Sequence, residues 1–226
     1  MIKDQFSIIL RTKNEERWVG HTIQSVIDNF YKPEILIIDN NSNDRTIEIA
    51  RNFKSNPNFS NNEYSNYCEI NIDYIDDYTP GKALNKGVEL AKHNNLMIIS
   101  SHCVIKDINL ESVIENLKKF SAVFGKQIPV IDGKRITRRY IWEHFGDKKV
   151  ENIFSSMENR YFLHNAFSFY KKETLLKYKF DENLSGKEDR YWAIEIRKNN
   201  MNFLYDPNHS VYHHYTPDGN TWKGIG

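Results

Sequence analysis

Two adjacent carboxylic acids, Glu188 and Asp189, stand directly before a stretch in which apolar residues recur at helical spacing, at Trp192, Ala193 and Ile196. This placement predicts that both acids lie in the first turn of a helix, where the helix dipole keeps a carboxylate ionised and the turn fixes its position. A carboxylate held in this way can act as a general base that removes a proton from a hydroxyl group. The alternative is that the two acids only favour the start of the helix.

Polar residues follow three short apolar runs in the first hundred residues. The runs and the polar residues after them are Phe6–Leu10 with Thr12 and Asn14, Glu34–Ile38 with Asp39, and Leu96–Ile99 with Ser100 and His102. The carboxyl ends of parallel strands meet at one edge of a sheet, and ligands bind beyond that edge. We therefore expect these side chains to share one ligand-binding rim. For Asp39 the alternative is a cap on the helix that follows it.

Strand and helix patterns alternate through the same part of the chain. Continuous apolar strands joined by amphipathic helices predict an α/β fold with a mainly parallel sheet and helices on both faces. Asn14 is expected to cap the helix that carries the apolar residues between Trp18 and Phe30. The second half is less regular, and Asp107 is expected to cap a helix there.

Composition narrows the class of protein. The chain has 226 residues and a formal net charge of +1, so it lacks the basic excess typical of a nucleic-acid-binding domain. No apolar run approaches the roughly eighteen residues that a membrane-spanning helix needs. No secretory signal precedes the first strand, which predicts a cytoplasmic location, with peripheral association at the inner face of the membrane as an alternative. Cys68 and Cys103 are expected to be reduced thiols.

Four segments occur in the order found in family 2 glycosyltransferases. They are 7–15 (SIILRTKNE), 37–46 (IIDNNSNDRT), 81–87 (GKALNKG) and 180–193 (FDENLSGKEDRYWA). The chain resembles that family over nearly its whole length. The resemblance implies a GT-A fold and a nucleotide-sugar donor. It also implies a single domain over residues 1–226, with a nucleotide-binding half at 1–106 and an acceptor-binding half with a C-terminal tail at 107–226.

The resemblance also suggests roles for individual residues. Asp189 would be the base and Glu188 would orient the acceptor. The residues expected to contact the donor are Thr12, Asn14 and Asp39 near the base, Lys82 and Asn85 near the diphosphate or ribose, Ser100 and His102 at the diphosphate edge, and Asn165 at the sugar. A solvated lysine and an ordinary helix amide are the alternatives for Lys82 and Asn85.

One departure concerns the metal. The family carries Asp-x-Asp after the strand that corresponds to Leu96–Ile99. This chain has Ser100-Ser101-His102 there, which is similar to a subset of the family with Ser-x-His-Cys. Imidazole ligates Mn²⁺ or Zn²⁺, whereas Mg²⁺ prefers oxygen. His102 is expected to replace the carboxylate, joined by His213 or His214. These two residues point to opposite faces if they lie on a strand, so at most one should enter the site. The resemblance implies that it is His213, which matches the family's late histidine. The alternative is a reaction without a metal, in which protein donors stabilise the diphosphate.

The function that these features imply is inverting transfer of a sugar from a nucleotide-sugar to a glycan or lipid-linked acceptor in bacterial surface polysaccharide (capsule) synthesis. A nucleotidyl- or sugar-phosphate transferase on a related fold is a weaker alternative, because residues 11–15 contain no glycine-rich loop. A non-catalytic module that binds sugar nucleotides is favoured by the missing Asp-x-Asp. The retained Glu188 and Asp189 oppose it.

Overall fold

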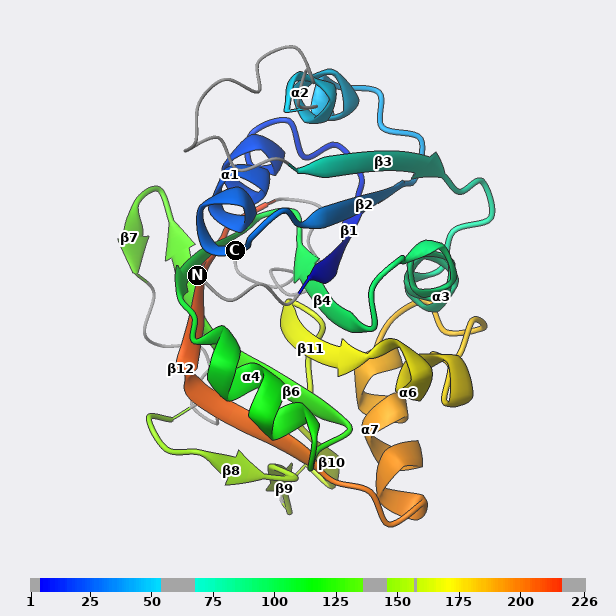
Figure 1. Ribbon diagram of the computed structural model, residues 1–226, viewed down its shortest axis with the longest axis vertical. Coiled ribbons are helices and arrows are strands. Elements are labelled where there is room, and N and C mark those ends of the chain that lie inside the picture. The colour runs from blue at the N-terminus through cyan, green and yellow to red at the C-terminus, as the bar shows by residue number, and fades with distance from the viewer. Residues whose placement is uncertain (1–4, 54–67, 136–145, 157, 217–226) are drawn as a thin grey trace.

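The computed structural model describes residues 5–53, 68–135, 146–156 and 158–216. Within them, one sheet of ten strands runs through the molecule (Figure 1). Across the sheet the strands are β3 (Glu69–Tyr74), β2 (Glu34–Asp39), β1 (Phe6–Thr12), β4 (Asn95–Ser100), β11 (Phe167–Lys171), β6 (Ala122–Ile131), β12 (Phe203–His214) and β5 (Cys103–Asp107). β7 (Lys134–Arg135) extends it beside β6, and β8 (Val150–Glu151) beside β12. β9 (Phe154–Ser155) and β10 (Arg160–Tyr161) pair separately.

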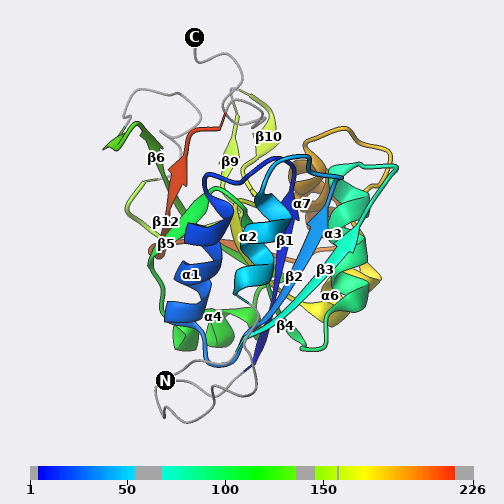
Figure 2. The same ribbon diagram turned by 90° about the horizontal axis from the view of Figure 1, so that it is seen from above.

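Helices cover both faces of the sheet, as Figure 2 shows. One face carries α1 (Val19–Asn29), α2 (Thr46–Asn52) and α4 (Leu110–Leu117). The opposite face carries α3 (Pro80–Leu90), α6 (Lys172–Lys177) and α7 (Glu188–Lys198). The prediction of an α/β sheet covered on both sides is confirmed, and helix α7 starts at Glu188 as expected.

The strands of the first half pair in parallel, so their carboxyl ends reach the same level. Thr12 of β1 lies opposite Asp39 of β2, and Arg11 lies opposite Ser100 of β4. All six residues of β2 are buried, which explains the continuous apolar pattern of this strand. The predicted rim of polar strand ends is therefore present for β1, β2 and β4.

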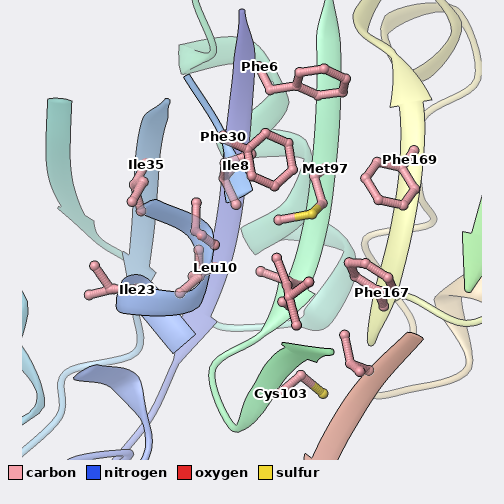
Figure 3. Close-up of a cluster of buried hydrophobic side chains, with 14 of the residues drawn as sticks. Phe6, Ile8, Leu10, Ile23, Phe30, Ile35, Met97, Cys103, Phe167 and Phe169 are labelled. Carbon is pink, nitrogen blue, oxygen red and sulfur yellow. The ribbon is translucent and has the colours of Figure 1, made fainter. Parts of the chain in front are cut away.

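A dense apolar cluster beneath α1 holds these strands in place (Figure 3). Phe6 of β1 meets Phe30 edge to face, with ring centroids 5.3 Å apart. Ile8 and Leu10 have no exposed surface, and Phe167 packs in the same cluster from β11. Burying each such side chain contributes about 1.5–3 kcal/mol before its entropy cost. The strand ends that carry the polar residues are thus anchored by a rigid core.

The second half departs from simple alternation, because its strands vary in length from 2 to 12 residues and pair partly antiparallel. β11 enters the sheet antiparallel to both β4 and β6, while β6 and β12 run parallel with a register shift between Tyr205 and Ser210. Gly125 of β6 allows β12 and β11 to approach closely at this point. A Cβ there would lie 2.6 Å from the carbonyl oxygen of His209 and equally close to the Phe167 ring. β12 consequently returns to the rim, where the His214 amide donates to the His102 carbonyl over 2.9 Å.

Two predicted helix caps are wrong. α1 begins at Val19 rather than directly after Asn14, which adopts a left-handed φ of 52° in the preceding loop. Asparagine tolerates this conformation. Asp107 ends β5 and accepts a hydrogen bond from Ser210 over 2.9 Å. The cap of α4 is Asn109, whose side chain accepts from the Ser112 amide.

Candidate active site

The ends of β1 and β2 are locked together around Asp39, whose side chain is fully buried. Thr12 Oγ1 donates to Asp39 Oδ1 over 2.7 Å. Ser42 donates twice to the same carboxylate, from its amide to Oδ2 over 2.7 Å and from its hydroxyl to Oδ1 over 2.6 Å. Asp39 is not the cap of α2, which begins at Thr46. The carboxylate therefore organises the loop where the nucleotide base is expected to bind.

The two loops above this carboxylate are also bonded to each other. Lys13 Nζ donates to the carbonyl oxygens of Asn40 and Asn41, both over 2.7 Å. Asn14 Oδ1 accepts from the Asn43 amide over 3.0 Å, and the Asn14 amide donates to Ser42 Oγ. Asn14 therefore shapes the predicted donor loop from within.

The turn between β4 and β5 carries Ser100 and His102, and β12 brings His213 against it. The Nε2 atoms of the two histidines are 3.0 Å apart. His102 Nδ1 lies 2.8 Å from Glu15 Oε1, and His213 Nδ1 contacts Gln127 Oε1. His214 points the other way and stacks on Trp18, with ring centroids 3.9 Å apart. The expected divergence of the adjacent histidines is present.

The hydrogen-bond partners orient the two rings of this histidine pair. Glu15 and Gln127 present acceptor oxygens to the Nδ1 atoms of His102 and His213, so the Nε2 atoms of the two rings face each other. Burial, followed by the nearby His102, lowers the pKa of His213 well below its usual range, which keeps that ring neutral. The two Nε2 atoms lie 3.0 Å apart, close enough for both to bind one cation. Among the described residues, no group of three or more His, Cys, Asp or Glu side chains forms a metal cluster.

The acidic pair lies at the start of α7, across the rim from β1. Glu188 is buried and forms an ion pair with Arg11, in which Arg11 Nη1 donates to Glu188 Oε1 over 3.1 Å. Asp189 is partly exposed, and its Oδ1 accepts from the Arg190 amide over 2.7 Å. Burial of the carboxyl, with the adjacent charge of Glu188, raises the pKa of Asp189 to about 7. A carboxylate with such a pKa exchanges protons readily near neutral pH.

Asn165 lies just before β11, beside the turn that holds Ser100. The Ser100 amide donates to the carbonyl of Ala166, the next residue. Asn165 Oδ1 accepts from Tyr170 Oη over 2.7 Å and from Ser168 Oγ over 3.2 Å. Its Nδ2 is buried and has no hydrogen-bond partner among the described residues. A buried donor left over in this way is costly unless a ligand completes it.

Lys82 and Asn85 lie on α3 and contact the segment that precedes α7. The Asn85 amide donates to the Phe180 carbonyl and to Glu182 Oε1, over 2.9 and 2.8 Å, and accepts from the Phe180 amide. Lys82 forms an ion pair with Asp77. Asn85 thus ties the third motif to the fourth, and donor contacts from these two side chains stay a prediction.

Sequence reasoning missed several residues that shape the site. They are Arg11, Glu15, Gln127 and Tyr170. Arg11 and Glu15 fall inside the first motif. The partners of Arg11, Glu15 and Gln127 lie 177, 87 and 86 positions away in the sequence, so no local pattern reveals these contacts. Tyr170 bonds Asn165 from five positions away.

Comparison with known proteins identifies the family. Residues 7–183 match the family described as Glycosyl transferase family 2. The chain belongs to this family. A similar curated relative is the poly-β-1,6-N-acetyl-D-glucosamine synthase of Staphylococcus epidermidis, 32% identical over 114 residues, which are 50% of this chain and 25% of the relative. The corresponding synthase of Staphylococcus aureus is 28% identical over 123 residues, 53% of this chain and 27% of the relative. The aligned part thus spans about a quarter of these relatives.

Solved structures of this family's fold extend over the whole chain. S. aureus TarS 1-349 in complex with UDP-GlcNAc aligns with a TM-score of 0.70 and 18% identity, covering 98% of this chain and 62% of that chain. GalNAc-T7 with UDP, GalNAc and Mn²⁺ aligns with a TM-score of 0.67 and 15% identity, covering 95% and 44%. This glycosyl transferase family 2 chain therefore has the GT-A fold that its motifs imply.

Proposed function

We propose that this chain is an inverting glycosyltransferase. It moves a sugar from a nucleotide-sugar donor to a hydroxyl of a glycan or lipid-linked acceptor in the synthesis of a bacterial surface polysaccharide. The observation that carries this proposal is the acidic pair at the start of α7, which Arg11 joins to the rim of strand ends. The Arg11 contact brings Asp189, a carboxyl of raised pKa, to the same rim as the loop that is organised around the buried Asp39.

Asp189 is the proposed base. It removes the proton from the acceptor hydroxyl while that oxygen attacks the anomeric carbon from the side opposite the leaving diphosphate. The proton goes to the carboxylate, the new bond forms at the anomeric carbon, and the bond to the diphosphate breaks. Glu188, buried beside it, orients the acceptor and keeps the proton affinity of Asp189 high.

The donor side is assigned to the predicted set. Asp39 with Thr12 and Asn14 organises the base-binding loop, and the free Nδ2 of Asn165 is available to a sugar oxygen. UDP-N-acetylglucosamine is the first donor to test, because TarS was solved with UDP-GlcNAc and the curated relatives are named for poly-N-acetylglucosamine.

A divalent cation fits the histidine pair. The Nε2 atoms of His102 and His213 face each other, and Glu15 and Gln127 orient the rings. Two imidazoles favour Mn²⁺ over Mg²⁺. When bound, such an ion neutralises charge on the leaving diphosphate. GalNAc-T7, with the same fold, was solved with Mn²⁺.

The acceptor hydroxyl is expected to reach the site from the α7 side of the rim, where Asp189 lies. We also propose that transfer takes place in the cytoplasm, at the inner face of the membrane, where a lipid-linked acceptor would be presented. In the part of the chain that the structure describes, no helix has the length and apolarity that crossing a bilayer requires.

A donor panel tests the function. Nucleoside diphosphates and nucleotide sugars are screened by calorimetry, and hydrolysis and transfer are then followed with and without Mn²⁺. Release of nucleoside diphosphate together with sugar transfer supports the proposal. Pyrophosphate release from a nucleoside triphosphate and a sugar phosphate would instead indicate a nucleotidyltransferase. Tight binding without turnover would indicate a binding module.

A further inference from the structure

Arg11 connects the segments of the site to one another. Its guanidinium bonds Glu188 on α7, 177 positions away in the sequence, over 3.1 Å. Its carbonyl oxygen accepts from Ser101 Oγ over 2.8 Å, one residue before His102. The next residue, Thr12, donates to Asp39. The end of β1 thus touches the base-bearing turn, the histidine turn and the predicted nucleotide loop.

The ion pair to Glu188 is far more buried than the surface pairs of the chain. The side chains of Arg11 and Glu188 are 20% and 6% exposed, whereas those of Lys118 and Glu115 are 61% and 67% exposed. A surface pair contributes little to stability. Breaking a buried pair leaves an uncompensated charge, so the geometry of this pair is strongly specified.

This pair ties the first residue of α7 to the rim, while Trp192, in the next turn, is anchored in the core and donates to the Tyr178 carbonyl. The residue before the helix, Lys187, is left-handed with a φ of 68° and makes no side-chain capping bond. Within the described part of the chain, Asp189 accepts a hydrogen bond from the amide of the next residue in the turn. Among the described residues, the ion pair from Arg11 is therefore the side-chain contact that ties Glu188 to the rim.

Arg11 also sets the charge around the base. Burial, the largest single influence, lowers the pKa of Arg11, but the charges of Glu188, Tyr78 and Asp189 together with the hydrogen bond to Glu188 outweigh it, so the pKa is raised and the guanidinium remains positive. The charge of Glu188 raises the pKa of Asp189, whereas the charge of Arg11 lowers it. Removing Arg11 would leave Glu188 unopposed next to Asp189.

We propose that Arg11 is a positioning residue for sugar transfer, holding the Glu188–Asp189 turn at the rim and offsetting the charge of Glu188. This proposal rests on the proposed function, since it assigns a task to a residue that need not touch either substrate. It predicts that Arg11 governs the transfer step and leaves donor affinity almost unchanged.

The first test compares Arg11→Met and Arg11→Lys with the wild type in a transfer assay over pH 5–9. Arg11→Met is expected to lower kcat about 10- to 100-fold through misplacement of the base. The acid limb of its pH profile should move up by about one unit. Arg11→Lys keeps the charge and should keep the limb near its wild-type position. Donor Kd from calorimetry should stay within about twofold in both, and Lys118→Met, which removes a charge from an exposed pair, should match the wild type.

A mutant cycle with Glu188→Gln covers the case in which Arg11→Met does not fold, because the double variant buries no unpaired charge. At pH 9, adding Arg11→Met to Glu188→Gln should lower kcat by less than about threefold, since both act through one contact. A full additional loss, or a wild-type kcat and pH profile in Arg11→Met, would overturn the role of Arg11 alone. Absence of transfer by the wild type with every donor would overturn the proposed function itself.

Discussion

The nucleotide loop and the chemical edge of the site differ in how completely their polar groups are satisfied. Around Asp39, both carboxylate oxygens accept hydrogen bonds from the side chain or backbone of the same two loops. Across the rim, the Nε2 atoms of His102 and His213 face each other, and Asn165 Nδ2 has no hydrogen-bond partner among the described residues. The first region is held together by its own hydrogen bonds, whereas the second presents polar atoms that suit a substrate or an ion.

This contrast has an energetic reading. A saturated network contributes to stability without any ligand, whereas a carboxyl of raised pKa and a buried donor such as Asn165 Nδ2 reduce stability. Substitutions in the two regions should therefore separate stability from activity.

Asp189→Asn should lower kcat by about a thousandfold or more, because the amide cannot accept the acceptor's proton. Nucleotide-sugar binding, measured by calorimetry, should change little. The folded-state pKa of Asp189 lies above its unfolded value, so this carboxyl lowers the stability of the fold as pH rises from the unfolded value of 3.8 to about 7, and the loss is complete above that pH. The variant should then melt at or above the wild-type temperature at pH 8, by about 3 °C at most. Full activity would remove Asp189 from the mechanism.

Asp39→Ala should show the opposite balance. It strips the partners from Thr12 and from both groups of Ser42, and should cost about 3 kcal/mol of unfolding free energy, measured by urea titration without ligand. Asp28→Ala, at an exposed carboxylate on α1, is the matched control and should cost less than about 0.5 kcal/mol. Equal stabilities of the two variants would show that the loop around Asp39 is not a stabilising network.

His213→Ala should weaken Mn²⁺ binding about a hundredfold, because it removes one of the two converging nitrogens. His214→Phe is the control, since the phenyl ring preserves the stack on Trp18 on the other side of the strand. Mn²⁺ titrations followed by electron paramagnetic resonance measure both. If His213→Ala binds Mn²⁺ as tightly as the wild type, the cation site lies elsewhere.

Glu15→Gln should have a smaller effect, about tenfold in Mn²⁺ affinity. The amide still fills the position beside His102 Nδ1 but accepts that proton less strongly, so the ring is a weaker ligand. The same titration reads the change. An effect as large as that of His213→Ala would mean that Glu15 binds the ion directly.

The first half of the fold could be predicted because its information is local. Each apolar strand is followed by its own helix, and the chirality of such units leaves few arrangements. The polar residues at the ends of β1, β2 and β4 consequently lie on one rim. Side chains alternate along β12, so His213 and His214 point to opposite sides of the strand. The helix start at Glu188 was equally local.

The missed features depend on partners that local patterns do not encode. The insertion of β11 between β4 and β6 and the close crossing at Gly125 follow from packing across the sheet. The bond from Arg11 to Glu188 joins residues 177 positions apart. Asn14 was misassigned because asparagine suits both a helix cap and the left-handed loop conformation that it adopts.

The stereochemistry of the transfer product tests the central claim most directly. An α-linked UDP-N-acetylglucosamine donor, or whichever α-linked nucleotide sugar the binding panel selects, is incubated with the wild type and a sugar acceptor. The anomeric configuration of the first product is followed by proton nuclear magnetic resonance. In-line attack assisted by Asp189 predicts a β-linked product that Asp189→Asn does not form. An α-linked product would contradict the mechanism.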